Sequence, residues 1–390
     1  ALRTAMGLTP HLLQDAVRLH GPEEIARILE SISKGELPES LLDALNNWPG
    51  YSALHLACSA PSTACTELLV TAKASLTLLT TSTWQTPLHL AAHSGSFFVA
   101  ELLVAANADV TAAEPDQDHD WNFSSKTFDA DPEKHFTPLH IASKAGNIPM
   151  MKRLLDARAE VNAQDSFGQT PLHLCLESAT EDDDFGPGVG IRVEGLKNKP
   201  ERNGKLGAII GPLEFEGACT GCEDPDCGRY PVLVEEGPPE GILLKPMNLR
   251  TVFQDALDVL ISARADINQG SRKAGTAFSV LHSAAHHGDV GLVEKVIAAR
   301  ADVNLQSAQG MTALHLAIRR RKLDLIRLLL TAGADPDLKT GGKTAHELAA
   351  INKLDLKLSE KIAKLQEQLT PCRSEYEKAT DFERAALFLE

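Results

Sequence analysis

The feature that most constrains this chain is a recurring motif in which a Ser or Thr precedes a Leu-His pair. Six copies end in the histidines His55, His89, His140, His173, His282 and His315. Their spacings of 34, 51, 33, 109 and 33 residues indicate a period of 33 residues with two interruptions. One copy is too short to bury both of its faces, so the copies have to stack into a solenoid.

Each copy carries the signals of two short helices and a turn-rich finger. In the third copy, Thr137 is a good N-cap and Pro138 is preorganised for the first helical position. A turn at 145–147 separates this first helix from a second apolar run at 150–155. The polar stretch 162–168 then predicts the finger that leads into the next copy.

With these features, the copies between 51 and 350 resemble ankyrin repeats, apart from the two interruptions. The resemblance implies a mainly α fold, an ankyrin-repeat solenoid of about six to seven repeats plus caps. It also implies that the repeated histidine is structural and bonds neighbouring backbone, which argues against a metal or catalytic array. A degenerate seventh copy begins at Thr344.

Helical patterns on both sides of the repeats predict caps for the two ends of the stack. Apolar residues recur at helical spacing from Leu12 to Leu45 and again from Leu354 to Leu369. The predicted organisation is an N-terminal helical cap or degenerate repeat at 1–50, repeats at 51–178 with an extended finger at 112–135, an inserted small β-barrel at 179–250, further repeats at 251–350, and a C-terminal helical cap at 351–390.

The first interruption lengthens one finger by 51 − 33 = 18 residues, and insertions at that position leave the helical stack intact. The inserted stretch is acidic and contains Trp121, Phe123 and Phe128. Three aromatic residues in so short an excess either pack locally or contact a partner. Both alternatives remain open at this stage.

The second interruption falls between the two helices of one repeat. Short apolar stretches punctuated by Gly and Pro predict strands near 189–193, 208–210, 230–234 and 242–244. With its Asn203-Gly204 turn signal, this segment resembles small Src-homology-3-like barrels. Related folds bind proline-rich peptides, modified tails or RNA. Between 186 and 250 there are 8 Lys plus Arg and 10 Asp plus Glu, a net charge of −2 that disfavours RNA.

Seven cysteines are scattered through the chain, which is atypical of a disulfide scaffold and indicates a reducing compartment. Cys219, Cys222 and Cys227 lie close together inside the second interruption. They could hold zinc with Asp224 or Asp226 as a fourth ligand, form a redox-labile pair, or lie in an ordinary reduced loop. We predict no cofactor and no metal, and we keep the three cysteines as weak metal candidates.

The formal net charge is 38 − 53 = −15, which argues against a general nucleic-acid or anionic-membrane binder. No apolar run reaches the roughly 18 to 20 residues that a membrane helix needs, so we predict no membrane insertion. We expect a cytoplasmic or other reducing intracellular location. Because the sequence begins at Ala1, a cleaved targeting segment upstream is an open alternative.

No catalytic motif is present, so the chain is predicted not to be an enzyme. The Gly-Gly-Lys-Thr stretch at 341–344 resembles the end of a phosphate-binding loop, but it coincides with the step from the finger to the helix cap of a repeat. Basic residues lie at the ends of the first helices of the later repeats. There they favour binding of an acidic or phosphorylated protein segment, or they simply complement the helix dipole. The predicted partner-binding residues are Arg319, Arg320, Arg321, Lys322, His286, His287, Lys144, Trp121, Phe123 and Phe128.

The predicted function is that of a non-enzymatic interaction scaffold or adaptor. Partner proteins would bind the concave ankyrin face, where the family usually binds its partners, and the inserted barrel. The alternative is a structural accessory subunit of a large multiprotein assembly, whose interfaces would be permanent and more apolar.

Overall fold

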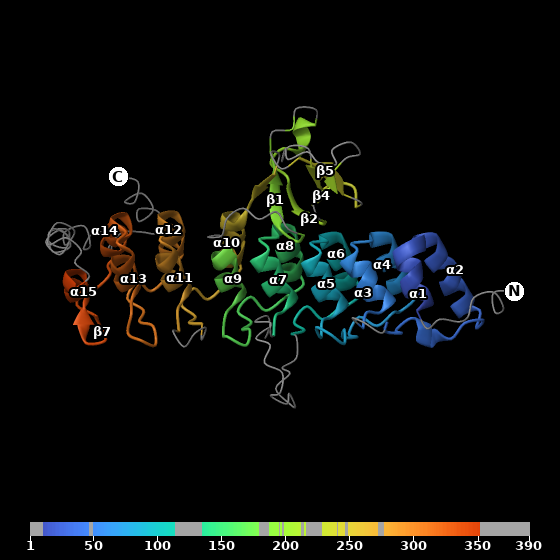
Figure 1. Ribbon diagram of the computed structural model, residues 1–390, viewed down its shortest axis with the longest axis horizontal. Coiled ribbons are helices and arrows are strands. Elements are labelled where there is room, and N and C mark those ends of the chain that lie inside the picture. The colour runs from blue at the N-terminus through green and yellow to red at the C-terminus, as the bar shows by residue number, and fades with distance from the viewer. Residues whose placement is uncertain are drawn as a thin grey trace. The chain divides into compact units, whose positions relative to one another are not determined.

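The computed structural model is a helical repeat stack with one inserted sheet (Figure 1). It describes residues 11–46, 50–113, 135–178, 187–194, 196, 199–211, 214–215, 228–239, 241–245, 249–271 and 277–351. The chain divides into two compact units, the first made of 1–165 and 183–259, and the second made of 166–182 and 260–390.

In the first unit, three helix pairs stack as two layers (Figure 1). The inner helices contact one another in sequence, and so do the outer helices. The inner helices are α3 (Ala53–Ser59), α5 (Pro87–His93) and α7 (Pro138–Lys144), and the outer helices are α4 (Thr63–Thr71), α6 (Phe97–Ala105) and α8 (Ile148–Asp156). Helix α7 begins after Thr137, as its cap predicts, and the repeats therefore follow the 33-residue signal.

The amino-terminal helices pack on the first pair of this stack. The short helix α1 (Leu12–Asp15) and the π-helical turn Ala16–His20 contact α3, while α2 (Pro22–Ser33) contacts α4. A 3-10 turn spans Glu39–Leu41. The segment predicted as the carboxy-terminal cap lies, beyond residue 351, outside the described residues.

The second unit repeats the same two-layer arrangement. Its inner helices are α9 (Pro171–Ser178), α11 (Val280–His287) and α13 (Ala313–Arg320), and the outer ones include α12 (Val290–Ala298) and α14 (Leu323–Thr331). A small hairpin of β7 (Lys339–Thr340) and β8 (Lys343–Thr344) leads into α15 (Ala345–Ile351), which contacts α13. Helix α10 (Phe253–Ser262) begins in the first unit and ends in the second.

The repeated histidine joins each repeat to the next. In α5, the Nδ1 atom of His89 accepts the backbone N–H of Thr86 at 3.3 Å and lies 2.7 Å from the Thr86 hydroxyl. Its Nε2–H donates to the carbonyl of Phe136 in the following finger at 2.9 Å. His55 and His282 bond their following fingers in the same way. All six histidines are buried. The bonds to the following finger confirm the structural role that the resemblance implies for His55, His89, His173 and His282, whereas the Nε2 atom of His315 has no hydrogen-bond partner among the described residues.

This arrangement requires a neutral imidazole and therefore makes the stack sensitive to acid. Burial lowers the pKa of His55, His89 and His173 from 6.5 to about 4. Below pH 6.5 the unfolded chain binds more protons than the folded chain, so the free energy of unfolding falls as the pH drops from 6.5 toward 4. Each histidine contributes up to about 1.4 kcal/mol per pH unit.

We therefore expect a lower urea midpoint at pH 5.5 than at pH 7. Both pH values lie above the range in which ordinary carboxylates titrate. His173→Gln should reduce this pH dependence, because it removes one of the buried imidazoles. Urea midpoints that are equal at the two pH values would contradict the prediction.

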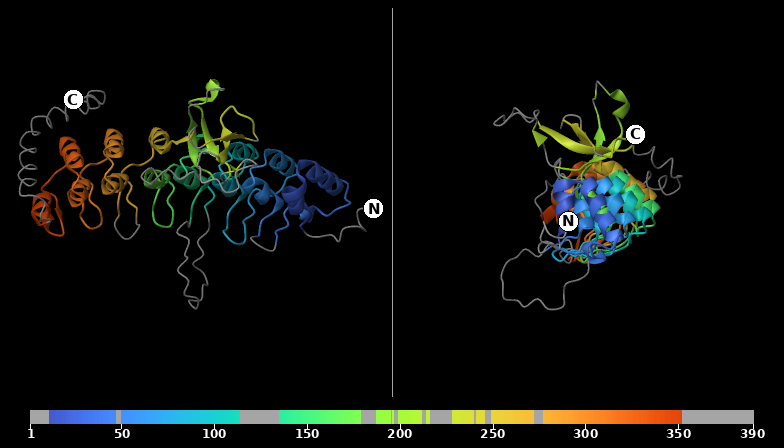
Figure 2. Two further views of the ribbon diagram at one scale, coloured as in Figure 1. Left: turned by 45° about the horizontal axis from the view of Figure 1, so that its top comes forward. Right: turned by 90° about the vertical axis from the view of Figure 1, so that its right-hand side faces the viewer.

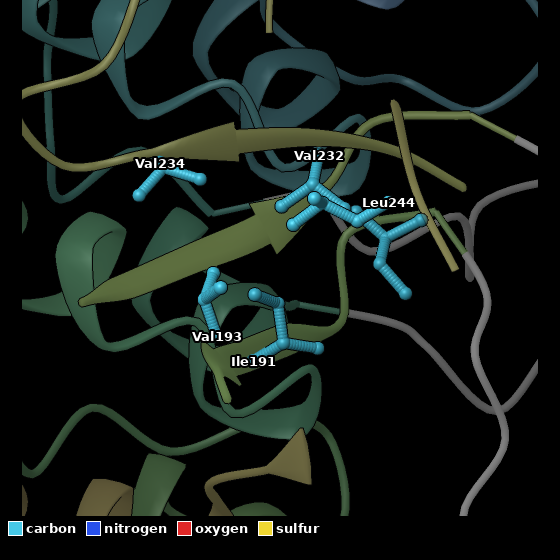
Figure 3. Close-up of a cluster of buried hydrophobic side chains, with 6 residues drawn as sticks. Ile191, Val193, Val232, Val234 and Leu244 are labelled. Carbon is cyan, nitrogen blue, oxygen red and sulfur yellow. The ribbon is translucent and has the colours of Figure 1, made fainter. Parts of the chain in front are cut away.

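The second interruption forms an antiparallel sheet with the strand order β3-β4-β2-β1-β6, in which β5 also pairs with β4. Its small apolar core consists of Ile191, Val193, Ile209, Val232, Val234 and Leu244 (Figure 3). A 3-10 turn, Pro200–Arg202, precedes β2. The strands are β1 (Gly190–Val193), β2 (Leu206–Ile209), β3 (Glu214–Phe215), β4 (Gly228–Val234), β5 (Ile242–Leu244) and β6 (Leu249–Thr251).

The predicted strands are confirmed, but the predicted closed barrel is wrong. Among the described residues, the end strands β3 and β6 do not pair with each other, so the sheet is open. β3 has only two residues, too few to extend the sheet round to its other end. β6 pairs with β1 and leads almost directly into α10, which ties that end of the sheet to the helical stack.

The sheet packs directly on the stack of the first unit, at the turns between inner and outer helices (Figure 2). The backbone N–H of Gly190 donates to the carbonyl of Ala145 at 2.8 Å. A Cβ atom on Gly190 would overlap the carbonyl of Gly146, and one on Gly188 would lie 2.7 Å from the carbonyl oxygen of His93. Glycines thus allow the backbones of the sheet and of the stack to approach each other closely.

Gly190→Ala should push the sheet off this turn, because the added methyl group meets backbone atoms that cannot rotate away. We expect faster hydrogen exchange in β1 and β2, with α11 to α14 unaffected. Gly291→Ala is the matched control, since its methyl group would meet only the Asp289 side chain, at 3.4 Å. Unchanged protection of β1 in Gly190→Ala would refute the docking contact.

Candidate functional site

A repeated contact defines the inner face, which we take as the surface formed by the finger bases and the ends of the inner helices. In each of several repeats, the residue before the cap contacts the residue eight positions later. Arg319 Nη1 lies 3.4 Å from the Met311 sulfur, and Lys144 Nζ lies 5.9 Å from the ring centre of Phe136. Both basic side chains therefore lie on the inner face, each in its own unit.

The structure brings together most of the basic residues singled out in the sequence. Arg320 Nη2 lies 2.8 Å from His286 Nε2, and the rings of His286 and His287 meet edge to face with centroids 5.7 Å apart. The aliphatic stem of Lys322 packs over Gly288. We call this exposed group the basic cluster, and its members are His286, His287, Arg319, Arg320, Arg321 and Lys322.

Within the described residues, no carboxylate pairs with Arg319 or Arg320 of the basic cluster. Among the residues that the structure describes, neither side chain takes part in an ion pair, and their contacts go to Met311 and His286. Partial burial, followed by the charges of Arg320, His287 and Arg319, lowers the pKa of His286. Because the charged form of His286 is disfavoured there, the neighbouring guanidinium groups supply the positive charge that would attract an anion.

Of the other predicted partner-binding residues, the structure describes only Lys144. Lys144 belongs to the first unit. Trp121, Phe123 and Phe128 lie outside the described residues, and so do Cys219, Cys222 and Cys227. Within the described parts of the chain, no group of three or more His, Cys, Asp or Glu residues could hold a metal ion.

The remaining three described cysteines behave as core residues. Cys58, Cys65 and Cys175 are buried free thiols, and burial raises the pKa of Cys58 well above its usual range. Such thiols are unreactive. None of the described helices is both long and apolar enough to cross a membrane.

Trp84 is a surface feature that the motif analysis missed. Its φ of 56° lies in the left-handed region, and 41% of the residue is exposed. Other repeats have Gly50, Gly168 or Gly310 at this position, two residues before the cap, all with positive φ. Aligning the copies by their caps reveals this substitution, whereas the search for charged and catalytic groups passes over it.

Comparison with known proteins agrees with the repeat architecture. A family model for ankyrin repeats in three copies matches residues 11–114 and 253–365, and a second ankyrin model matches 129–175. The B-cell lymphoma 3 protein homolog of Mus musculus is 28% identical over 207 residues, which are 52% of this chain and 45% of that protein. The nuclear factor NF-kappa-B p105 subunit of Gallus gallus is 30% identical over 204 residues, which are 52% of this chain and 17% of that protein.

The crystal structure of the ankyrin repeat domain of Bcl-3, described as a member of the IkappaB protein family, has a similar fold. It aligns with a TM-score of 0.52 and 20% identity, covering 81% of this chain and 99% of that one. The chain spans less than half the length of these two curated relatives. With ankyrin models matching more than half of its residues, the chain belongs to the ankyrin-repeat family.

Proposed function

We propose that this protein is a non-enzymatic adaptor whose inner face, together with the inserted sheet, binds partner proteins. The basic cluster is proposed to recognise an acidic or phosphorylated segment of one partner. The observation that carries this proposal is the pair of guanidinium groups on Arg319 and Arg320, which lie beside His286 without carboxylate partners among the described residues. Guanidinium groups bind carboxylates and phosphates by paired hydrogen bonds.

The local charge supports an anionic ligand. From 279 to 351 the chain has 9 Lys plus Arg and 7 Asp plus Glu, a net charge of +2, although the whole chain carries −15. Such a local reversal guides an acidic segment to this part of the surface and repels it elsewhere. The buried free thiols also favour a reducing intracellular location for such an adaptor.

The comparisons support a repeat scaffold and leave its partner to be identified. These two curated relatives match this chain over about half of its length, and an ankyrin-repeat model matches residues 11–114 and 253–365. In a solenoid of this kind, the residues that differ between repeats lie on the exposed surface, where a partner can bind them. The basic cluster is such a set of residues.

Replacing Arg319 and Arg320 together by Ser should weaken binding of an acidic peptide by about tenfold or more, because two charged donors are lost. Fluorescence anisotropy with a labelled Glu-rich peptide and its phosphorylated counterpart measures the affinity. Arg327→Ser is the control, since it removes a similar exposed charge from the outer helix α14. Equal affinities for the wild type and the Arg319/Arg320 double variant would refute the proposed site.

The pH dependence of binding should report on His286, which faces His287, Arg319 and Arg320 and has a lowered pKa. A bound anion favours the protonated imidazole and raises this pKa, so binding takes up a proton. We expect the affinity to increase as the pH falls below the pKa of His286 in the bound protein. It should level off once the pH is below the pKa of His286 in the free protein. His286→Gln should remove this increase, and a variant that keeps it would exclude His286 as the group responsible.

A further inference from the structure

The turn between α13 and α14 differs from the corresponding turns of several other repeats at three consecutive positions. The first is Arg321, which has a left-handed φ of 58°. At the same position other repeats have Gly95, Gly146 and Gly288, with φ between 63° and 81°. A residue with a Cβ atom is less stable than Gly in this conformation by about 1 to 2 kcal/mol.

The second position is the N-cap of the outer helix. Ser62, Asn147 and Asp289 occupy it in three other repeats, and their side chains accept hydrogen bonds from the first turn of the helix. In α14 the N-cap is Lys322, which has no acceptor atom in its side chain and makes no capping bond. Loss of a side-chain cap destabilises a helix by about 0.5 to 2 kcal/mol.

The third position is Leu323, which is 47% exposed. Two of its counterparts, Phe97 and Ile148, are 0% and 2% exposed, and two others, Thr63 and Val290, are partly buried. Those two residues belong to the part of the first unit on which the inserted sheet packs, where Gly190 bonds Ala145 and β2 contacts α8. The edge that the inserted sheet covers in those two repeats therefore carries an exposed leucine in this one.

We propose that Arg321, Lys322 and Leu323 form a docking surface, which we call the turn edge, for an acidic segment of a partner protein. Leu323 would contact an apolar side chain of that segment, and the two cations would pair with its carboxylates. This inference rests on the proposed recognition of an acidic partner and extends the contact from the inner face over the turn. Successive residues that each reduce stability are expected at functional sites.

A protein segment fits the turn edge better than a nucleic acid. An exposed leucine beside two cations gives a sugar-phosphate backbone no apolar partner, whereas protein interfaces combine apolar anchors with charged rims. The chain as a whole is also strongly acidic, which repels a long polyanion.

The double variant Arg321→Gly with Lys322→Asp restores the turn of the other repeats and provides the sharpest test. It should raise the melting temperature while it weakens binding of an acidic peptide by about tenfold or more. A residue whose role is only structural cannot produce these opposite changes. Arg264→Gly is the matched control, because Arg264 is exposed, has a φ of 66° and belongs to the same unit. It should raise stability and leave the affinity unchanged.

Leu323→Ser tests the apolar contact separately. The probes are two fluorescent peptides rich in Glu and Asp, one with a central Phe and one with Ser in its place, measured with the full chain at low salt. The wild type should prefer the Phe peptide. Leu323→Ser should abolish this preference and bind the Ser peptide as the wild type does, because the charged contacts remain.

The outcomes separate this inference from the proposed function. If the Arg321/Lys322 variant binds both peptides as tightly as the wild type while Arg319→Ser with Arg320→Ser loses binding, acid recognition belongs to the inner face and the turn edge is overturned. If the wild type binds neither peptide, both the proposed recognition of acidic segments and the proposed turn edge are refuted. Tighter binding of a duplex DNA than of either peptide would overturn the choice of a protein partner.

Discussion

The stack depends on one buried imidazole per repeat. A histidine such as His89 accepts from the backbone at the start of its own helix and donates to the carbonyl of Phe136 in the next finger. The side chain therefore satisfies groups that helix ends otherwise leave unpaired, and it does so in two repeats at once. An isolated repeat would leave one ring nitrogen without its partner, which explains why the motif recurs with the helices.

The same constraint determines where the chain tolerates insertions. Both interruptions leave the caps and the histidine bonds intact: His89 still reaches Phe136 across the long finger, and His173 still reaches Phe278, 3.3 Å away, across the inserted sheet. A loop of added residues costs little conformational entropy when its ends are already held. What the second insertion adds is contact, since Gly188 and Gly190 bring the backbone of the sheet against that of the stack.

The local elements could be predicted from the sequence, because caps and apolar spacing act within a few residues. The predicted start of α7 after Thr137 and the run at 150–155 within α8 agree with the structure. Closure of the sheet could not be predicted in this way. It depends on pairing between strands as distant as β1 and β6, where Ile191 lies opposite Thr251, and on the packing of that end against helices. Turn signals such as Asn203-Gly204 say nothing about either.

The candidate site shows a different limit. Its charges were visible as a run of basic residues, but the run alone is equally consistent with a solvated helix end. The position of each residue in the repeat helps to distinguish these cases, because Arg321 and Trp84 occupy positions where three other copies have glycine with a positive φ. In a repeat protein each copy is a control for the others. A position at which one copy gives up stability that its neighbours retain therefore points to selection for something other than folding.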